Sequence, residues 1–154
     1  MRSPTINLFF YPDDYIKFLQ RPKYYLDSTI VESDCDCDYP VGKIDDIYVH
    51  FLHYDSFEQA VEKWEIRKER INWDNLFVIM TDRDGCTEEN IRQFDELPYK
   101  NKVIFVSKPC NYQSACYVSN YKGPYYNSYC NIFGSRYYDV FDFLSWFNTY
   151  GNSQ

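Results

Sequence analysis

The sequence predicts an α/β fold with three layers, in which helices cover both faces of a mostly parallel sheet. Residues 76–80 are a continuous apolar run that resembles a central strand, residues 102–106 resemble a further buried strand, and a predicted helix separates them. A further strand at residues 47–52 and a helix after it precede this unit, with short connections. Alternating strands and helices are typical of right-handed crossovers in a parallel sheet. We therefore expect one domain spanning residues 1–154.

The sequence of the first third of the chain predicts a strand, a short helix and a long acidic loop. Residues 5–10 mix β-branched and aromatic side chains, and the segment from Pro12 begins like a helix that Pro22 ends or kinks. Residues 29–32 are a candidate edge strand. Residues 34–42 combine carboxylates with proline and glycine, which predicts an exposed loop.

The middle of the chain contains the clearest elements. Alternation predicts a strand at residues 47–52 with both faces largely buried. Ser56 and Gln59 form a capping-box pattern ahead of apolar residues at helical spacing. Thr87 is the expected N-cap of the helix between the two central strands, because acidic residues follow it in the first turn.

The C-terminal third is less regular. Residues 115–118 form a candidate strand within a stretch rich in tyrosine, asparagine and serine. Apolar residues then recur at helical spacing and predict a terminal helix that docks on the sheet. These residues are Tyr137, Val140, Phe141, Leu144 and Phe147.

Composition excludes several classes of partner. The 154 residues include 16 basic and 23 acidic side chains, a net charge of -7, and nucleic acid is therefore not an expected partner. No apolar run approaches the roughly 20 residues of a membrane span, and no signal pattern opens the chain, so we expect a cytoplasmic protein. Aromatic residues make up 21%, which suits either a core or a stacking surface.

The six cysteines predict neither a zinc site nor a disulfide framework. The only close pair, Cys35 and Cys37, has a spacing that is too short for the usual zinc knuckle. In a reducing compartment, free thiols are the expected state. Cys86, ahead of a helix N-terminus, could act as a nucleophile, although a small packed residue is the favoured interpretation.

Candidate site residues gather in the loops that follow the predicted strands. Ligands of open parallel sheets bind outside the carboxyl ends of the strands. His53 is a candidate general base, and Asp82 with Asp84 could hold a substrate or an ion as catalytic carboxylates. Arg83 and Lys108 are candidate substrate-binding cations. The alternative is that residues 82–85 are an ordinary turn, and that His53 is a bystander.

A second cationic group lies on the helix after residue 56. Lys63, Arg67 and Arg70 share one helical stripe, and only Asp74 is spaced to pair with them. An anion site is conceivable there, whereas a solvated helix face is the favoured interpretation.

Three segments carry a resemblance to a known family. Residues 49–105 (VHFLHYDSFEQAV and onward), 39–47 (YPVGKIDDI) and 3–19 (SPTINLFFYPDDYIKFL) resemble an uncharacterised bacterial family found in exopolysaccharide and capsule gene clusters. The resemblance covers most of residues 3–108, and residues 109–154 are poorly matched. It implies a Rossmann-like fold and a setting in cell-surface polysaccharide synthesis. It also implies that an N-terminal segment typical of the family is missing here.

Together these observations favour a transferase that acts on a sugar or polysaccharide precursor. In that hypothesis the loop at residues 82–84 handles the donor or acceptor, and His53 is the base. The alternative is a non-catalytic protein of the same pathway, such as a shortened and inactive relative, that binds glycans or a partner through aromatic side chains. Metal-dependent hydrolysis of a phosphorylated sugar ranks below both. No cofactor is specified by the sequence.

Overall fold

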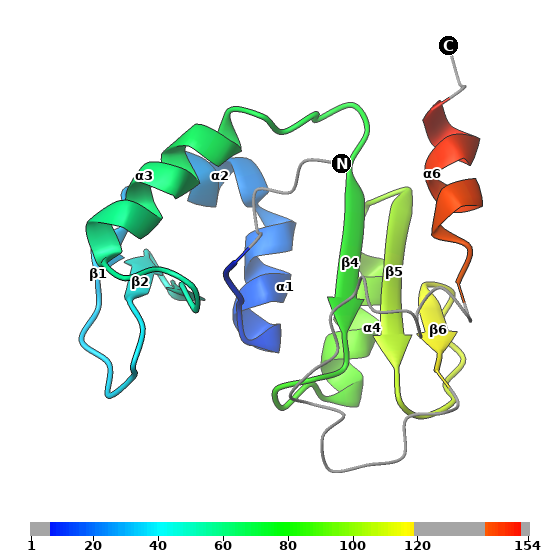
Figure 1. Cartoon of the computed structure of the whole chain (residues 1–154). Helices are drawn as coiled ribbons and strands as arrows, with labels where there is room; N and C mark the ends of the chain where they lie inside the picture. Colours follow the sequence, from blue (N-terminus) through cyan, green and yellow to red (C-terminus); the bar gives the residue numbers. More distant parts are fainter. Residues whose placement is uncertain (1–6, 119–140, 152–154) are drawn as a thin grey trace. The chain divides into compact units, whose positions relative to one another are not determined.

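The computed structural model describes residues 7–118 and 141–151, and the chain divides into two compact units (Figure 1). The first unit is Met1–Asp74 and the second is Asn75–Gln154. The described residues form a mixed α/β structure with an antiparallel three-stranded sheet in the first unit and a parallel three-stranded sheet in the second. The prediction of a mostly parallel sheet was therefore wrong for the first unit.

Two helices open the first unit. Helix α1 is Pro12–Gln20 and helix α2 is Pro22–Asp27. Pro22 ends α1, as expected, and also begins α2, because proline lacks an N–H and is tolerated in the first helical turn. The predicted strand at residues 5–10 is reduced to a single bridge, in which Phe9 pairs with His50. Residues 5 and 6 lie outside the described ranges.

The antiparallel sheet contains one strand that the sequence did not predict. Strands β1 (Val31–Glu32), β2 (Val41–Ile44) and β3 (Ile47–His50) pair in that order. Gly42 suggested a loop, but the structure places it inside β2, where a Cβ atom would lie 2.6 Å from Ile30 Cδ1. Close approach of another side chain is a recognised reason for glycine within a strand.

Strand β3 is buried on one face rather than on both. Ile47, Val49 and Phe51 are completely buried, whereas Tyr48 is 39% and Leu52 41% exposed. The expectation of two buried faces was wrong at these two residues, because an antiparallel sheet needs cover on only one side. His50 is buried on the other side, as predicted.

Helix α3 (Phe57–Lys68) follows the prediction closely. The Ser56 side chain accepts a hydrogen bond from the Gln59 N–H, and the Gln59 side chain accepts one from the Asp55 N–H. Trp64 packs at the core of this unit, 6.3 Å from the ring of Phe18. The helix ends at Lys68, before residue 71, where the predicted apolar pattern stopped.

The second unit is built on parallel strands. Strands β4 (Phe77–Thr81), β5 (Asn101–Val106) and β6 (Ala115–Tyr117) pair in that order, and helix α4 (Glu88–Glu96) connects the first two. Helix α4 lies behind β4 and β5 in the view of Figure 1. Thr87 caps α4 with a complete capping box, which confirms the predicted start. All three strands were predicted within one or two residues.

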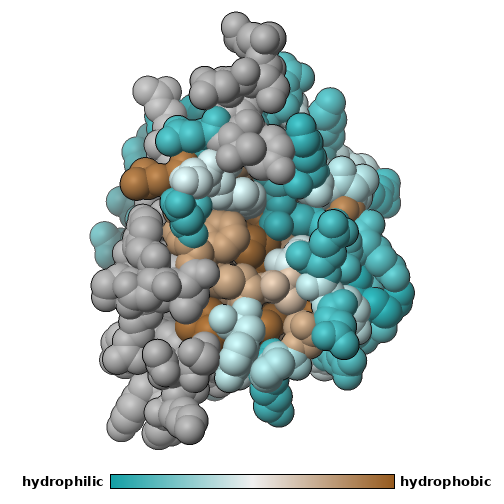
Figure 2. Space-filling model, turned by 90° about the vertical axis from the view of Figure 1, so that its right-hand side faces the viewer, coloured by the Kyte–Doolittle hydropathy of each residue, from teal (hydrophilic) through white to brown (hydrophobic). Residues whose placement is uncertain are grey.

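Helix α6 (Phe143–Gly151) packs on strands β4 and β5 through aromatic side chains. Phe77 makes edge contacts with Trp146 and Phe147, at ring distances of 4.9 and 4.8 Å. Figure 2 shows apolar side chains gathered on the face that carries α6 and β6. Leu144 was predicted to face the core but is 72% exposed. Residues 137 and 140 of the predicted pattern lie outside the described ranges.

No helix in residues 7–118 or 141–151 combines the length and apolar character that crossing a membrane requires.

Candidate functional site

The loops after β4 and β5 are joined at the carboxyl edge of the parallel sheet. The Asp82 carboxylate accepts hydrogen bonds from the Ser107 N–H and from its hydroxyl, both at 2.6 Å. The Asp82 N–H also donates to the Phe105 carbonyl at 3.0 Å. Charge-assisted bonds of this length are strong, so Asp82 holds the two loops together. This contact favours a positioning role, and the catalytic role of Asp82 stays a prediction.

Asp84 lies in a tight turn next to this contact. Asp84 and Gly85 have φ values of 55° and 85°, and the Cys86 N–H donates to the Arg83 carbonyl at 3.0 Å. Positive φ at both central residues is typical of a type I′ turn, and aspartate and glycine tolerate it well. The turn interpretation therefore describes the backbone here. Asp84 itself is exposed, so its carboxylate is accessible to a ligand.

The two candidate cations flank the Asp82–Ser107 contact. Arg83 follows Asp82, and its Nε donates to the Thr81 hydroxyl at 3.1 Å, which fixes the start of its side chain near the end of β4. Lys108 follows Ser107 and is exposed. The structure thus brings two cations to the same junction, because each directly follows one of the two residues that the hydrogen bonds join.

The N-terminus of α4 opens at this same edge but is already capped. The Thr87 hydroxyl accepts from the Asn90 N–H, and the Asn90 side chain accepts from the Thr87 N–H at 2.9 Å. Glu88 and Glu89 occupy the first turn. Because capping bonds and carboxylates already offset the positive end of the helix dipole, an anion would be drawn to the cations rather than to this helix end.

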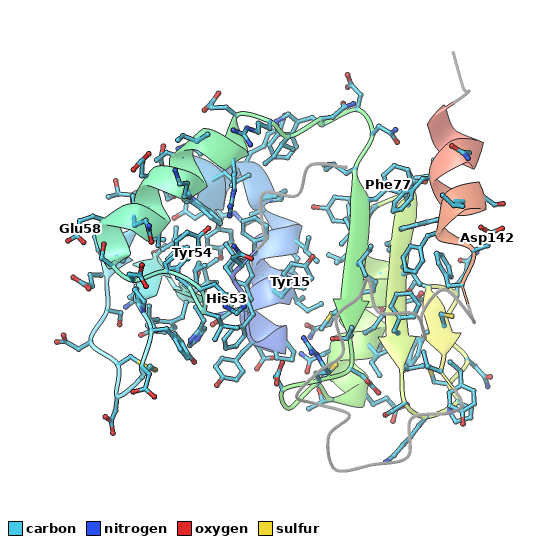
Figure 3. The ribbon with its side chains drawn as sticks, viewed as in Figure 1. Tyr15, His53, Tyr54, Glu58, Phe77 and Asp142 are labelled. Carbon is cyan, nitrogen blue, oxygen red and sulfur yellow. A yellow bond between two sulfur atoms is a disulfide. The ribbon has the colours of Figure 1, made fainter. Side chains whose placement is uncertain are left out.

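His53 belongs to the first unit, in the loop between β3 and α3 (Figure 3). It is exposed, and its role as a base stays a prediction. His50 is the buried histidine, as expected. Its ring stacks on Phe9 at 4.4 Å, its Nδ1 has no hydrogen-bond partner, and burial lowers its pKa below the ordinary value of 6.5.

Comparisons with known proteins place this arrangement in a family. A family model described as a domain of unknown function, DUF1919, matches residues 1–148. The chain belongs to the DUF1919 family. It is also 44% identical over 153 residues to an uncharacterized protein of Haemophilus influenzae, with 95% of this chain and 73% of that protein covered. The family match continues well past residue 108, so the weak resemblance expected for residues 109–154 was wrong as far as residue 148.

Sequence reasoning missed a second carboxylate contact in this DUF1919 protein. The Asp95 carboxylate accepts hydrogen bonds from the Ser114 N–H and hydroxyl, at 2.7 and 2.6 Å, and joins the end of α4 to the start of β6. Burial opposes ionisation of Asp95, but the bonds from Ser114 outweigh it and lower its pKa. No local motif could have indicated this contact, because it depends on which loop faces the helix end.

A third polar cluster fixes the β2–β3 turn. Tyr25 donates to Asp46 at 2.7 Å, and Lys17 forms an ion pair with the same carboxylate at 3.0 Å. Burial and this hydrogen bond raise the pKa of Tyr25 to about 12, while the bonds from Tyr25 and Lys17 lower the pKa of Asp46. Tyr24 donates to Asp45, which has a φ of 53°. The cluster anchors the hairpin to both helices and is structural.

The cationic stripe on α3 is partly engaged. Arg67 donates to the Tyr54 hydroxyl at 2.5 Å, with its guanidinium 5.9 Å from the Tyr54 ring centre. Arg67 therefore helps to hold the β3–α3 loop. The anion-site interpretation of this stripe stays a prediction.

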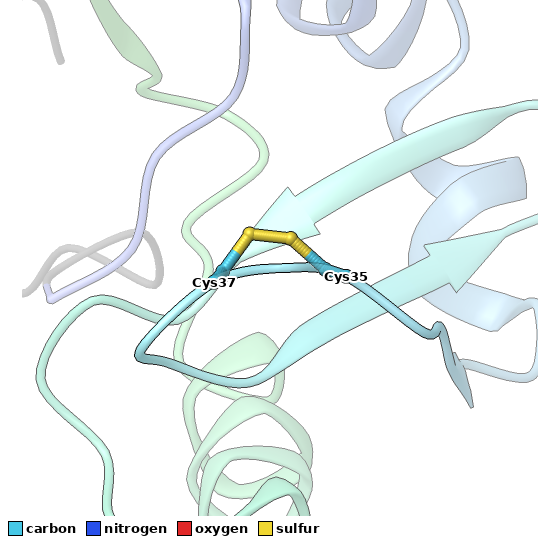
Figure 4. The surroundings of a disulfide bond; sticks show 2 residues. All are labelled: Cys35 and Cys37. Atoms are coloured by element: carbon cyan, nitrogen blue, oxygen red, sulfur yellow. A yellow bond between two sulfur atoms is a disulfide. The ribbon is translucent and has the colours of Figure 1, made fainter.

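The cysteines depart from the expected thiol state at one position. Cys35 and Cys37 are joined by a disulfide bond in the loop between β1 and β2 (Figure 4). The expectation of free thiols was wrong for this pair, because the loop brings their Cα atoms to 5.2 Å, within the range that a disulfide spans. Cys86, Cys110 and Cys116 are thiols that form no disulfide bond in the structure. No group of three metal-ligating side chains gathers in the described part of the chain.

Proposed function

We propose that this protein takes part in the synthesis of a cell-surface polysaccharide, as a transferase that binds a phosphorylated sugar donor at the carboxyl edge of its parallel sheet. The observation that carries the proposal is the Asp82–Ser107 contact, which brings Arg83 and Lys108 to one junction. Two cations at the end of a parallel sheet suit a nucleotide sugar, because guanidinium and ammonium groups both bind phosphate oxygens. The resemblance of residues 3–108 to a family found in exopolysaccharide and capsule gene clusters supports the proposed setting.

The same edge offers groups that suit the sugar. Asp84 and Glu88 are exposed carboxylates, and the Tyr112 hydroxyl lies 3.5 Å from Glu88. Carboxylates accept hydrogen bonds from sugar hydroxyls, and aromatic rings pack on the apolar faces of sugars. The parallel sheet with α4 and α6 also supports a Rossmann-like architecture for the second unit. In this proposal Asp84 orients a sugar hydroxyl.

A non-catalytic role is the second candidate. It is favoured by Asp82, whose carboxylate is engaged with Ser107 rather than available as a base. In that case the edge binds the sugar without turnover, and the protein serves as a carrier or assembly component. The two candidates share a ligand and differ in chemistry.

Binding is tested with a panel of nucleotide sugars and isothermal titration calorimetry of the purified chain. Arg83→Gln and Lys108→Gln should each weaken binding by about tenfold, because each removes one charged contact worth about 1.5 kcal/mol. The matched control is Lys100→Gln, which removes the same charge at the opposite end of β5 and should leave the affinity unchanged.

Turnover then separates the two candidates. Release of the nucleotide in the presence of acceptor glycans, lost in Asp84→Asn, supports the transferase. Binding that depends on Arg83 and Lys108 but gives no nucleotide release supports the carrier. No binding by any nucleotide sugar, or equal weakening by Lys100→Gln, contradicts the proposed site.

A further inference from the structure

The disulfide between Cys35 and Cys37 closes a very small ring. Only Asp36 separates the two cysteines. A disulfide stabilises a fold mainly by restricting the unfolded chain, and this effect grows with the length of the loop that it closes. A bond between residues two apart restricts the unfolded chain very little, so the bond contributes little to folding.

The structure around the disulfide is secured without it. The Ser33 N–H donates to the Val41 carbonyl at 2.9 Å, and the Phe51 N–H donates to the Pro40 carbonyl at 3.0 Å. These bonds close the loop outside both cysteines. Opening the disulfide therefore changes the loop tip and leaves the β1–β2–β3 sheet intact.

The two sulfur atoms are also placed where a reductant can reach them. Cys35 is exposed and Cys37 is half-buried, in the loop between β1 and β2 (Figure 4). Exposed disulfides that contribute little to the stability of the fold exchange readily with external thiols. A bond that is accessible and dispensable for the fold is suited to a chemical role.

We propose that Cys35–Cys37 is a redox-active disulfide that exchanges with a low-molecular-weight thiol. One external thiolate attacks a sulfur of the bond and displaces the other cysteine as a thiolate, which takes up a proton. A second external thiol then attacks the mixed disulfide. The protein gains two thiols, and the two external thiols leave as their own disulfide, so that two electrons pass to the protein.

Charge around the loop selects the exchanging thiol. Asp34, Asp36 and Asp38 alternate with the cysteines, and all three are exposed. Three carboxylates so close to the sulfurs repel a thiolate that carries further negative charge more than one whose own ammonium group offsets the charge on sulfur, and the effect is strongest at low ionic strength. The site therefore favours a low-molecular-weight thiol that carries a positive charge.

The experiment follows the disulfide in the native full-length chain by alkylation and mass spectrometry. Trypsin releases residues 24–43 as one peptide that holds both cysteines and no other, so their state is read without interference. We expect millimolar 2-mercaptoethanol to reduce the bond without denaturant. We also expect the Cys35→Ser/Cys37→Ser variant to melt within a few degrees of the natural chain.

Selection is measured as the ratio of reduction rates for cysteamine, a cationic thiol, and glutathione, an anionic one. The triple variant Asp34→Asn/Asp36→Asn/Asp38→Asn should lower this ratio about tenfold at low ionic strength. The intrinsic reactivities of the two thiols cancel when the ratio in the variant is compared with the ratio in the natural chain. Three outcomes would overturn the redox role. They are absence of the disulfide from the oxidised chain, reduction of the bond only in denaturant, and a large drop in melting temperature in the Cys35→Ser/Cys37→Ser variant. An unchanged ratio would overturn the charge selection.

Discussion

Replacing Asp82 by alanine tests whether this carboxylate holds the sheet edge together. The variant loses two short hydrogen bonds to Ser107 and leaves the Ser107 N–H without its acceptor. Bonds to a charged acceptor contribute about 1.5–3 kcal/mol each, and because Asp82 is partly exposed, we discount the pair to a total of about 2–3 kcal/mol. That loss corresponds to a drop in melting temperature of about 10–15 °C for a unit of this size.

The assay is urea denaturation followed by circular dichroism, with hydrogen exchange of peptides that span Ser107. Asp82→Ala should lower the free energy of unfolding and speed exchange at the Ser107 amide. The matched control is Asp84→Asn, which removes an exposed carboxylate at a positive φ that asparagine also tolerates, and should change stability by less than about 0.5 kcal/mol. An Asp82→Ala variant as stable as the natural chain would show that this carboxylate is not a structural contact and would return it to the candidate catalytic groups.

Three further changes test the first unit. Burial lowers the pKa of His50 in the folded state, so the unfolded chain binds a proton at His50 more readily, and the free energy of unfolding should fall as the pH drops below 6.5. In denaturation curves recorded across pH, His50→Phe should remove the part of this pH dependence that comes from His50. Gly42→Ala should destabilise by about 1–3 kcal/mol in urea, since its Cβ collides with Ile30, and no loss would contradict the close packing. Tyr25→Phe should cost about 1 kcal/mol and raise the pKa of the Asp46 carboxyl, followed by NMR titration; an unchanged pKa would contradict the hydrogen bond.

The parallel strands were predictable because their local signal is strong. Residues 77–80 and 103–106 are continuous apolar runs, which are typical of strands inside a parallel sheet. The caps of α3 and α4 were predictable for a related reason, since a capping box lies within four residues of sequence. Local chemistry determines these elements almost completely.

The antiparallel sheet was not predictable in the same way. Strand β2 contains Gly42, a residue that usually weakens a strand, and the reason for the glycine is Ile30, a distant residue in the sequence. The contacts of Asp82 with Ser107 and of Asp95 with Ser114 likewise join segments 25 and 19 residues apart. Strand register therefore decides which carboxylates are hydrogen-bonded and which are accessible. The pattern of apolar and polar residues in the sequence does not specify that register.

Binding at the carboxyl edge of the parallel sheet is the central claim, and an NMR titration of the isotope-labelled chain with nucleotide sugars tests it most directly. We predict that the largest amide shifts lie at residues 83–86 and 107–108, with none at the opposite ends of β4 and β5. Shifts that cluster elsewhere, or no shifts at millimolar ligand, would contradict the claim.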